Sequence, residues 1–314
     1  MTFDDTTRPR EDAGPEAVLA ERRRLVSIAY RLLGSVAEAE DAVQEGYARW
    51  YAMPEEERDA IRSPGAWLTT VTGRICLDHL GSARVRRERY VGEWVPEPVP
   101  GGAGWASSGT QPAGPDPADR VTLDESVTMA FLVTLESMSP AERVALILHD
   151  VFGYPFSEVA EIVGRTPQAC RQLAYSARNR ARASRVSSAP SPEQGEVVEA
   201  FRRAWQAQDV AAILDVLDPD AVVIADGGGR TRAAVEPVVG AEQVARHFMW
   251  VAGQRWRDMA VTVSAQVVNG RPGLVARVGG VTASVLAFGF DGARIKQIWA
   301  VVNPDKLRHW DRDA

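Results

Sequence analysis

The sequence of 314 residues contains few of the side chains that metal centres and disulfide frameworks require. It has two cysteines, Cys76 and Cys170, and four histidines that are scattered without ligand spacing. Neither a disulfide framework nor a metal site is therefore expected. Apolar runs fall short of the roughly 20 residues that cross a bilayer, and the polar N-terminus has no apolar signal core. We expect a cytoplasmic protein that uses no metal, cofactor or membrane.

Lysine is nearly absent as well, occurring only at Lys296 and Lys306. The formal net charge of −6 argues against a general nucleic-acid binder. The positive charge is local, however: six arginines and no acid occur from Arg165 to Arg185, and residues 83–89 hold four arginines and one glutamate. Basic stripes on an acidic chain are typical of proteins that bind phosphate backbones.

Apolar periodicity divides the chain into three blocks. Residues 16–92 and 121–186 have helical spacing, whereas residues 196–310 combine helical segments with alternating β-rich runs separated by glycine turns. A stretch rich in Pro, Gly and Ser over 93–120 predicts a flexible linker, and 187–195 predicts a shorter one. The expected fold is multidomain, with two all-α domains followed by an α+β domain.

The second block ends in a pattern typical of a helix-turn-helix. The residues from Gly164 to Thr166 form a short turn, and Thr166 can cap the basic helix that begins at Pro167. Arginine and glutamine side chains read base edges in the major groove, and later arginines suit phosphates. The candidates on this helix are Gln168, Arg171, Gln172, Tyr175, Arg178 and Arg182. The alternative is a solvated basic helix.

Two segments of the first block are ambiguous by themselves. "EDAVQE" at 40–45 indicates an exposed acidic helix face. The segment 67–89 indicates an amphipathic helix with a basic end, and leaves nucleic-acid binding open.

Taken together, these segments resemble one family. "YRLLGSVAEAEDAVQEGYARW", "PGAWLTTVTGRICLDHL" and the helix-turn-helix resemble, in the same order, regions 2 and 4 of extracytoplasmic-function (ECF) sigma factors. "GEWVPEP", "DGGGR" (226–230) and "NPDKL" (303–307) resemble the SigJ-like subgroup, which carries a fused SnoaL-like domain, a cone-shaped α+β barrel. That subgroup more often has lysine where this chain has Arg230. The resemblance implies a promoter-recognition subunit of RNA polymerase.

The resemblance also implies roles for individual residues. An acidic face would dock on the clamp helices of the largest polymerase subunit, and its residues are Asp41, Gln44, Glu45 and Trp50. The helix that melts and reads the −10 element would use Arg74, Asp78, His79, Arg84, Arg86 and Arg87. The helix from Pro167 to Arg182 would read the −35 element.

The third block is expected to regulate the other two in cis, so that no separate anti-sigma factor is required. The interdomain residues implied are Asp226, Gly227, Gly228, Gly229, Arg230, Asn303, Pro304, Asp305, Lys306 and Leu307. The glycines predict a tight turn from which Asp226 and Arg230 face outward. Promoter elements lie about 50–70 Å apart, whereas a relaxed linker of about 28 residues spans roughly 26–32 Å. This difference predicts a compact free state and an open state on DNA.

Other interpretations of the third block remain. Barrels of this kind often enclose an apolar pocket, and its candidate lining is Trp205, Trp250, Trp256, His247 and Asp226. Asp226 could serve there as a base, or the aromatic residues could simply form the core. We expect no enzymatic activity and no catalytic residues. The alternative function is a stand-alone helix-turn-helix regulator with a ligand-sensing or vestigially enzymatic SnoaL-like domain.

Overall fold

The computed structural model describes residues 15–87, 90–106, 122, 124–183, 191–231, 233–255 and 259–311. The first domain is helical, and Ser35 begins its second helix by accepting a hydrogen bond from the Glu38 amide. Its helices are α1 (Pro15–Leu33), α2 (Val36–Ala52), α3 (Glu55–Ala60) and α4 (Pro64–Arg87). No helix within the described ranges has the length and apolar composition that a membrane span requires.

The second domain is also helical and contains the expected helix-turn-helix. Its elements are η2 (Glu125–Val127), α5 (Met129–Glu136), α6 (Pro140–Leu146), the π-helical turn η3 (Ile147–Val151), α7 (Phe156–Val163) and α8 (Pro167–Ala183). Gly164 adopts a left-handed conformation, with φ of 68°, which ends α7. The Thr166 hydroxyl then accepts the Ala169 amide and caps α8.

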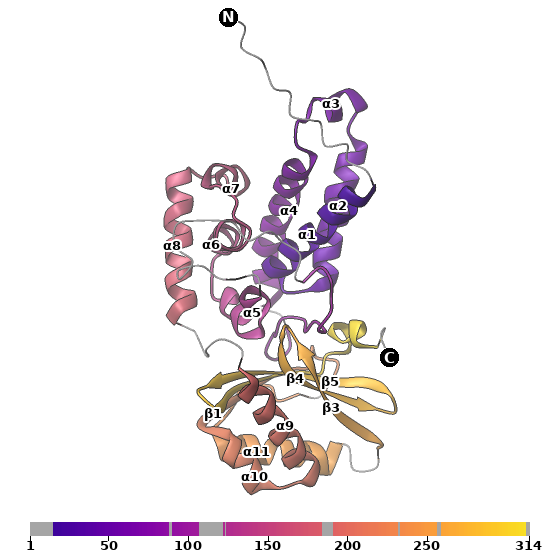
Figure 1. Cartoon of the computed structure of the whole chain (residues 1–314), viewed down its shortest axis with the longest axis vertical. Helices are drawn as coiled ribbons and strands as arrows, with labels where there is room; N and C mark the ends of the chain where they lie inside the picture. Colours follow the sequence, from indigo (N-terminus) through magenta and orange to yellow (C-terminus); the bar gives the residue numbers. More distant parts are fainter. Residues whose placement is uncertain are drawn as a thin grey trace, which may run out of the picture.

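The two helical domains share one apolar core. Helix α4 packs against α6 and α7, and the Gly73 backbone lies directly beside the Ile162 side chain. The hydroxyls of Thr69 and Tyr154 are 2.9 Å apart across this contact, and Nη2 of Arg74 donates to the Glu161 carbonyl at 3.0 Å. We call this surface between α4 and α7 the helical contact. Figure 1 shows the two domains side by side above the sheet of the third.

The third domain is an α+β domain, as predicted. Its elements are α9 (Pro192–Ala207), α10 (Val210–Val216), β1 (Leu217–Asp226), β2 (Val238–Val239), α11 (Ala241–Trp250), η4 (Val251–Arg255), β3 (Val261–Val268), β4 (Arg271–Val278), β5 (Val281–Asp291), β6 (Arg294–Val301), η5 (Pro304–Lys306) and η6 (Arg308–Trp310). The strand order is β2-β1-β6-β5-β4-β3, and β3 to β6 form the expected antiparallel meander. The sheet as a whole is mixed, because β1 pairs with β6 in parallel.

Strand alternation gives the sheet two buried faces. On β5, Leu286 and Phe288 pack against α9 to α11, whereas Val285 and Ala287 face the opposite side. That opposite face meets Met129 of the second domain. The sheet therefore lies between its own helices and the helical domains (Figure 1).

The prediction of a flexible linker over 93–120 is wrong for its first part. Val95, Glu97 and Val99 are at most 3% exposed, and Pro100 forms a β-bridge with Val268. The prolines of this segment remove helical periodicity, but its valines still bury apolar surface between the domains. Residues 107–121 lie outside the described residues, as do 187–190 of the shorter linker, whereas α9 already begins at Pro192.

Candidate nucleic-acid and interdomain interfaces

Helix α8 presents most of the residues expected to contact DNA. Gln168, Arg171, Gln172 and Tyr175 are exposed, as is Arg182 in the last turn. The Arg171 guanidinium donates to Oε1 of Gln168 at 2.7 Å and lies 5.3 Å from the centre of the Phe156 ring. These contacts hold the side chain on the outer surface of the helix-turn-helix. Apolar Cys170 and Ala174 on the other face are fully buried.

Arg178 differs from the rest of this set. Its Nε and Nη2 atoms donate to the two Asp150 oxygens at 2.6 and 2.9 Å, and the Asp150 side chain is 2% exposed. A bidentate pair to a buried carboxylate joins α8 to η3. Helical spacing places Arg178 on the same side of α8 as Arg171. In the structure, however, the Arg178 side chain turns inward to a partner from another element. Its placement on the base-reading face is therefore wrong in this conformation.

Helix α4 carries the residues expected to read the −10 element. Asp78 is exposed and His79 is half-buried. Arg74 is exposed but donates to Glu161 in the helical contact. The side chains of Arg84, Arg86 and Arg87, at the end of α4, lie outside the described residues.

Helix α2 presents the acidic face expected to bind polymerase. Asp41, Gln44 and Glu45 are exposed, and Glu45 accepts from Arg49 at 2.5 Å. Trp50 is partly buried instead, with its ring 5.2 Å from that of Trp67. Trp50 thus packs at the edge of the core.

The "DGGGR" loop contacts the linker. Asp226 is fully buried, which corrects the expectation that it faces outward. Its Oδ1 accepts from the Tyr90 hydroxyl at 2.6 Å, and its Oδ2 accepts from the Val95 amide at 3.0 Å and from Nζ of Lys306 at 2.7 Å. Arg230 does face outward and pairs with Asp305 at 2.7 Å. Burying a carboxylate is costly in isolation, but these donors compensate it.

Lys306 completes this contact from the C-terminal segment. Its Nζ donates to the Val95 carbonyl at 2.5 Å and lies 4.1 Å from the centre of the Trp94 ring. Asn303 donates to the Tyr90 hydroxyl at 2.9 Å, and Leu307 is 2% exposed. Burial, followed by the hydrogen bond from the Tyr90 hydroxyl to Asp226, raises the pKa of Tyr90. The phenol therefore retains the proton that it donates.

Glu97 connects the linker to the first domain. Its Oε2 accepts from the Val36 amide, the first of α2, at 2.8 Å, and Tyr30 donates to its backbone carbonyl at 2.7 Å. His309 lies 3.7 Å from its other oxygen. Burial raises the pKa of Glu97. A linker carboxylate thus caps the helix that carries the acidic face.

Asn269 ties the three domains together. It adopts a left-handed backbone with φ of 49° in the β3–β4 turn. Its side chain accepts from the Val99 amide at 3.1 Å and donates to the Tyr30 hydroxyl at 2.8 Å and to the Val127 carbonyl at 2.9 Å. We call the whole docking of residues 90–100 on the C-terminal domain the linker contact. The sequence predicted glycine turns between the β-rich runs, but it did not predict these roles of Asn269, Tyr90 and Glu97.

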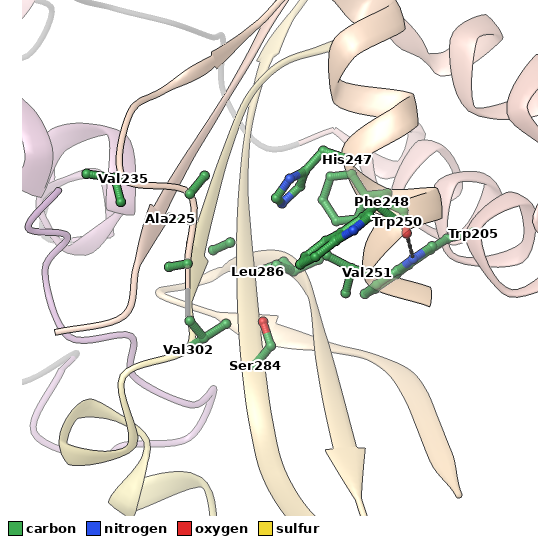
Figure 2. A pocket seen from close by; sticks show the side chains of 13 residues that line it. Trp205, Ala225, Val235, His247, Phe248, Trp250, Val251, Ser284, Leu286 and Val302 are labelled. Carbon is green, nitrogen blue, oxygen red and sulfur yellow. Dashed lines mark hydrogen bonds between the residues drawn. The ribbon is translucent and has the colours of Figure 1, made fainter. Parts of the chain in front are cut away.

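The third domain also encloses a cavity of about 440 Å³ (Figure 2). Trp205, His247 and Trp250 line it, as expected, whereas Trp256 lies outside the described residues. Asp226 does not line it, and its carboxylate bonds to the linker instead. The suggestion that Asp226 serves as a base in this cavity is therefore wrong. No group of three or more potential metal ligands occurs in the part of the chain that the structure describes.

Comparison with known proteins identifies the class. The family model of Sigma-70 region 2 matches residues 17–86, that of Sigma-70 region 4 matches 128–180, and that of a SnoaL-like domain matches 198–301. The chain is 38% identical over 289 residues to the probable ECF RNA polymerase sigma factor SigI of Mycobacterium tuberculosis, and the matched residues cover 92% of each chain. It is 36% identical over 297 residues to the ECF RNA polymerase sigma factor SigJ of that organism, covering 92% of this chain and 91% of SigJ.

The fold agrees with these relationships. The crystal structure of Mycobacterium tuberculosis SigJ superposes with a TM-score of 0.72 at 32% identity, covering 94% of this chain and 99% of the SigJ chain. The chain belongs to the ECF RNA polymerase sigma factors that carry a C-terminal SnoaL-like domain. The relatives that it matches along most of their length are named as sigma factors.

Proposed function

We propose that this chain binds core RNA polymerase through the acidic face of α2 and directs it to promoters, reading the −10 element with α4 and the −35 element with α8. The exposure of Asp41, Gln44 and Glu45 supports the polymerase contact. An acidic face steers association with a basic partner such as the clamp helices and fixes its register. The exposed Gln168 and Arg171 support base reading by α8.

The C-terminal domain regulates this activity in cis. The linker contact carries this proposal, because it holds residues 94–100 in a folded conformation. A sigma factor that spans two promoter elements needs its linker extended, since the elements lie about two duplex turns apart. In the helical contact, Arg74 of α4 also donates to the Glu161 carbonyl of α7, which ties a candidate −10 residue to the second domain. These two contacts support a compact free state that must open on promoter DNA, and in this proposal the C-terminal domain takes the place of a separate anti-sigma factor.

Run-off transcription with core polymerase tests both parts. The full chain is compared with a chain that ends near residue 190 and with full-length Lys306→Met, which breaks the linker contact. Promoter-dependent transcripts are expected from all three, at levels that differ between the full chain and the two altered forms. Absence of transcripts from every form contradicts the sigma activity, and equal output from all forms contradicts the regulation.

Promoter reading has its own matched pair on α8. Arg171→Ala should weaken binding by about 1–3 kcal/mol and relax specificity at one base. Arg178→Ala should instead destabilise the second domain by about 3–5 kcal/mol, because Asp150 is left buried and unpaired. Measurement combines binding to a promoter library with thermal unfolding. Unchanged promoter choice in Arg171→Ala contradicts the assignment.

A further inference from the structure

The cavity of the third domain has the dimensions and composition of a small-molecule site. It lies between α11 and the sheet, and its volume of about 440 Å³ falls within the range of about 300–1,000 Å³ that ligand sites occupy. Val235 and Trp250, at 69% and 51% exposure, are partly open to solvent and mark its mouth. In Figure 2 the side chains of His247 on α11, Leu286 on β5 and Val302, the residue after β6, converge on the same space.

The lining defines the chemistry of a ligand. The walls are aliphatic and aromatic, and the polar side chains among them are His247 and Ser284. Nε1 of Trp205 already donates to the Phe248 carbonyl at 3.1 Å. Burial lowers the pKa of His247, which favours the neutral form of its imidazole. Among the described lining residues none is charged, and a charged ligand would lose its hydration without a partner. The lining suits a neutral, flat and largely apolar molecule with a hydroxyl or carbonyl group.

One wall of the cavity is also part of the linker contact. Ala225 and Val302 line the cavity, and the residues that follow them, Asp226 and Asn303, bond to the linker. The Val302 amide donates to the Asp226 carbonyl at 2.8 Å, which joins the two strand ends. A ligand that presses on this wall therefore acts on the residues that hold Tyr90.

The loop after β1 provides a second connection. Its later residues, 233–235, line the cavity, whereas its glycines approach the linker and the C-terminal segment. A Cβ at Gly228 would lie 2.3 Å from the Asn303 side chain, and one at Gly229 would lie 3.1 Å from Val91. These approaches leave the loop little freedom while the linker is docked. Docking thus holds the cavity wall in one shape.

We propose that this cavity binds a neutral, flat, apolar molecule whose polar group meets His247 and Ser284, and that its occupancy strengthens the linker contact. The direction follows from preorganisation: a site whose wall is already fixed binds its ligand more tightly than one whose wall is free. By linkage, the ligand then favours the docked state by the same factor. The regulatory meaning of this coupling rests on the proposed function, whereas the binding does not.

Binding is tested on the full chain with three probes of one shape: hydroxypyrene, pyrene and pyrene carboxylate, followed by quenching of tryptophan fluorescence. Hydroxypyrene should bind most tightly, and pyrene carboxylate should bind about tenfold or more weakly.

Ala300→Leu fills the cavity and should weaken the binding of hydroxypyrene about tenfold or more. Ala293→Leu, the same change in an exposed turn, should leave its affinity unchanged. His247→Phe should retain pyrene and lose the preference for hydroxypyrene. Failure of the wild-type chain to bind hydroxypyrene, or equal affinity in Ala300→Leu, overturns the site.

Coupling is tested separately. Lys306→Met should weaken the binding of hydroxypyrene about fivefold or more, whereas Lys296→Met, at the other lysine, should leave its affinity unchanged. Hydroxypyrene should in turn slow hydrogen exchange at residues 94–100 by the same factor. Equal affinity in Lys306→Met, or unchanged exchange with bound probe, overturns the coupling. Run-off transcription without probe reports on the sigma activity independently, so its failure and the failure of the site are distinguishable.

Discussion

The helical contact and the linker contact both keep the chain compact, but they are built from different chemistry. The helical contact joins apolar surfaces with hydrogen bonds such as that between Thr69 and Tyr154. The linker contact buries ionised groups, with Asp226 and Lys306 0% and 10% exposed. Neutral groups can separate and rehydrate at modest cost, whereas a buried pair that loses one member leaves an uncompensated charge. We therefore expect the helical contact to open in small steps and the linker contact to release as a unit.

The largest effect should come from Asp226→Ala. It leaves the Lys306 ammonium buried without its carboxylate and should destabilise the linker contact by about 3–5 kcal/mol. Hydrogen exchange at residues 94–100 should accelerate accordingly, while exchange in α9 to α11 remains slow. The control is Asp220→Ala on the same strand, whose side chain is 87% exposed. If the two variants exchange alike, the ion pair does not hold the linker.

A smaller effect is expected at Asn269. Replacement by glycine keeps the left-handed backbone but removes the partners of the Val99 amide and the Val127 carbonyl, at a cost of about 1–3 kcal/mol. Replacement by alanine should cost about 1 kcal/mol more, because its Cβ disfavours this conformation. Urea unfolding of both variants measures the difference. A glycine variant as stable as wild type would mean that backbone shape, and not hydrogen bonding, gives Asn269 its role.

The helical contact should respond less than either of these. Tyr154→Phe removes its hydrogen bond with Thr69, for about 1 kcal/mol, and Thr69 keeps its bond to the Gly65 carbonyl. Small-angle scattering should show a larger open fraction, with exchange at residues 94–100 unchanged. Faster exchange there would show that the two contacts open together.

The comparison also shows what a sequence can reveal. Helices and strands were predictable because their signals are local: Ser35 and Thr166 cap helices, and β3 to β6 alternate with turns between them. The residues of the linker contact were not, because their roles depend on partners distant in the chain. Glu97 lies in a stretch without periodicity, yet it meets the start of α2. Arg178 likewise shares its helix with Arg171, and only the fold supplies Asp150.

The smallest effect, and the one that distinguishes charge from hydrogen bonding in the linker contact, is expected from Glu97→Gln. Burial raises the pKa of Glu97 above its ordinary value of 4.5, so docking favours the protonated form. An acid with a raised pKa stabilises the docked state fully below its unfolded pKa, and this contribution is lost as pH rises through the docked value. As pH rises from the unfolded to the docked pKa of Glu97, hydrogen exchange at residues 94–100 of the wild-type chain should therefore accelerate by more than the intrinsic pH dependence of exchange.

The glutamine side chain of the variant still accepts from the Val36 amide. At neutral pH, the free energy of opening measured by exchange at residues 94–100 should therefore stay within about 1 kcal/mol of wild type. The variant should also lack the pH-dependent component. A glutamine variant that keeps the same pH profile would show that Glu97 is not the source of that profile.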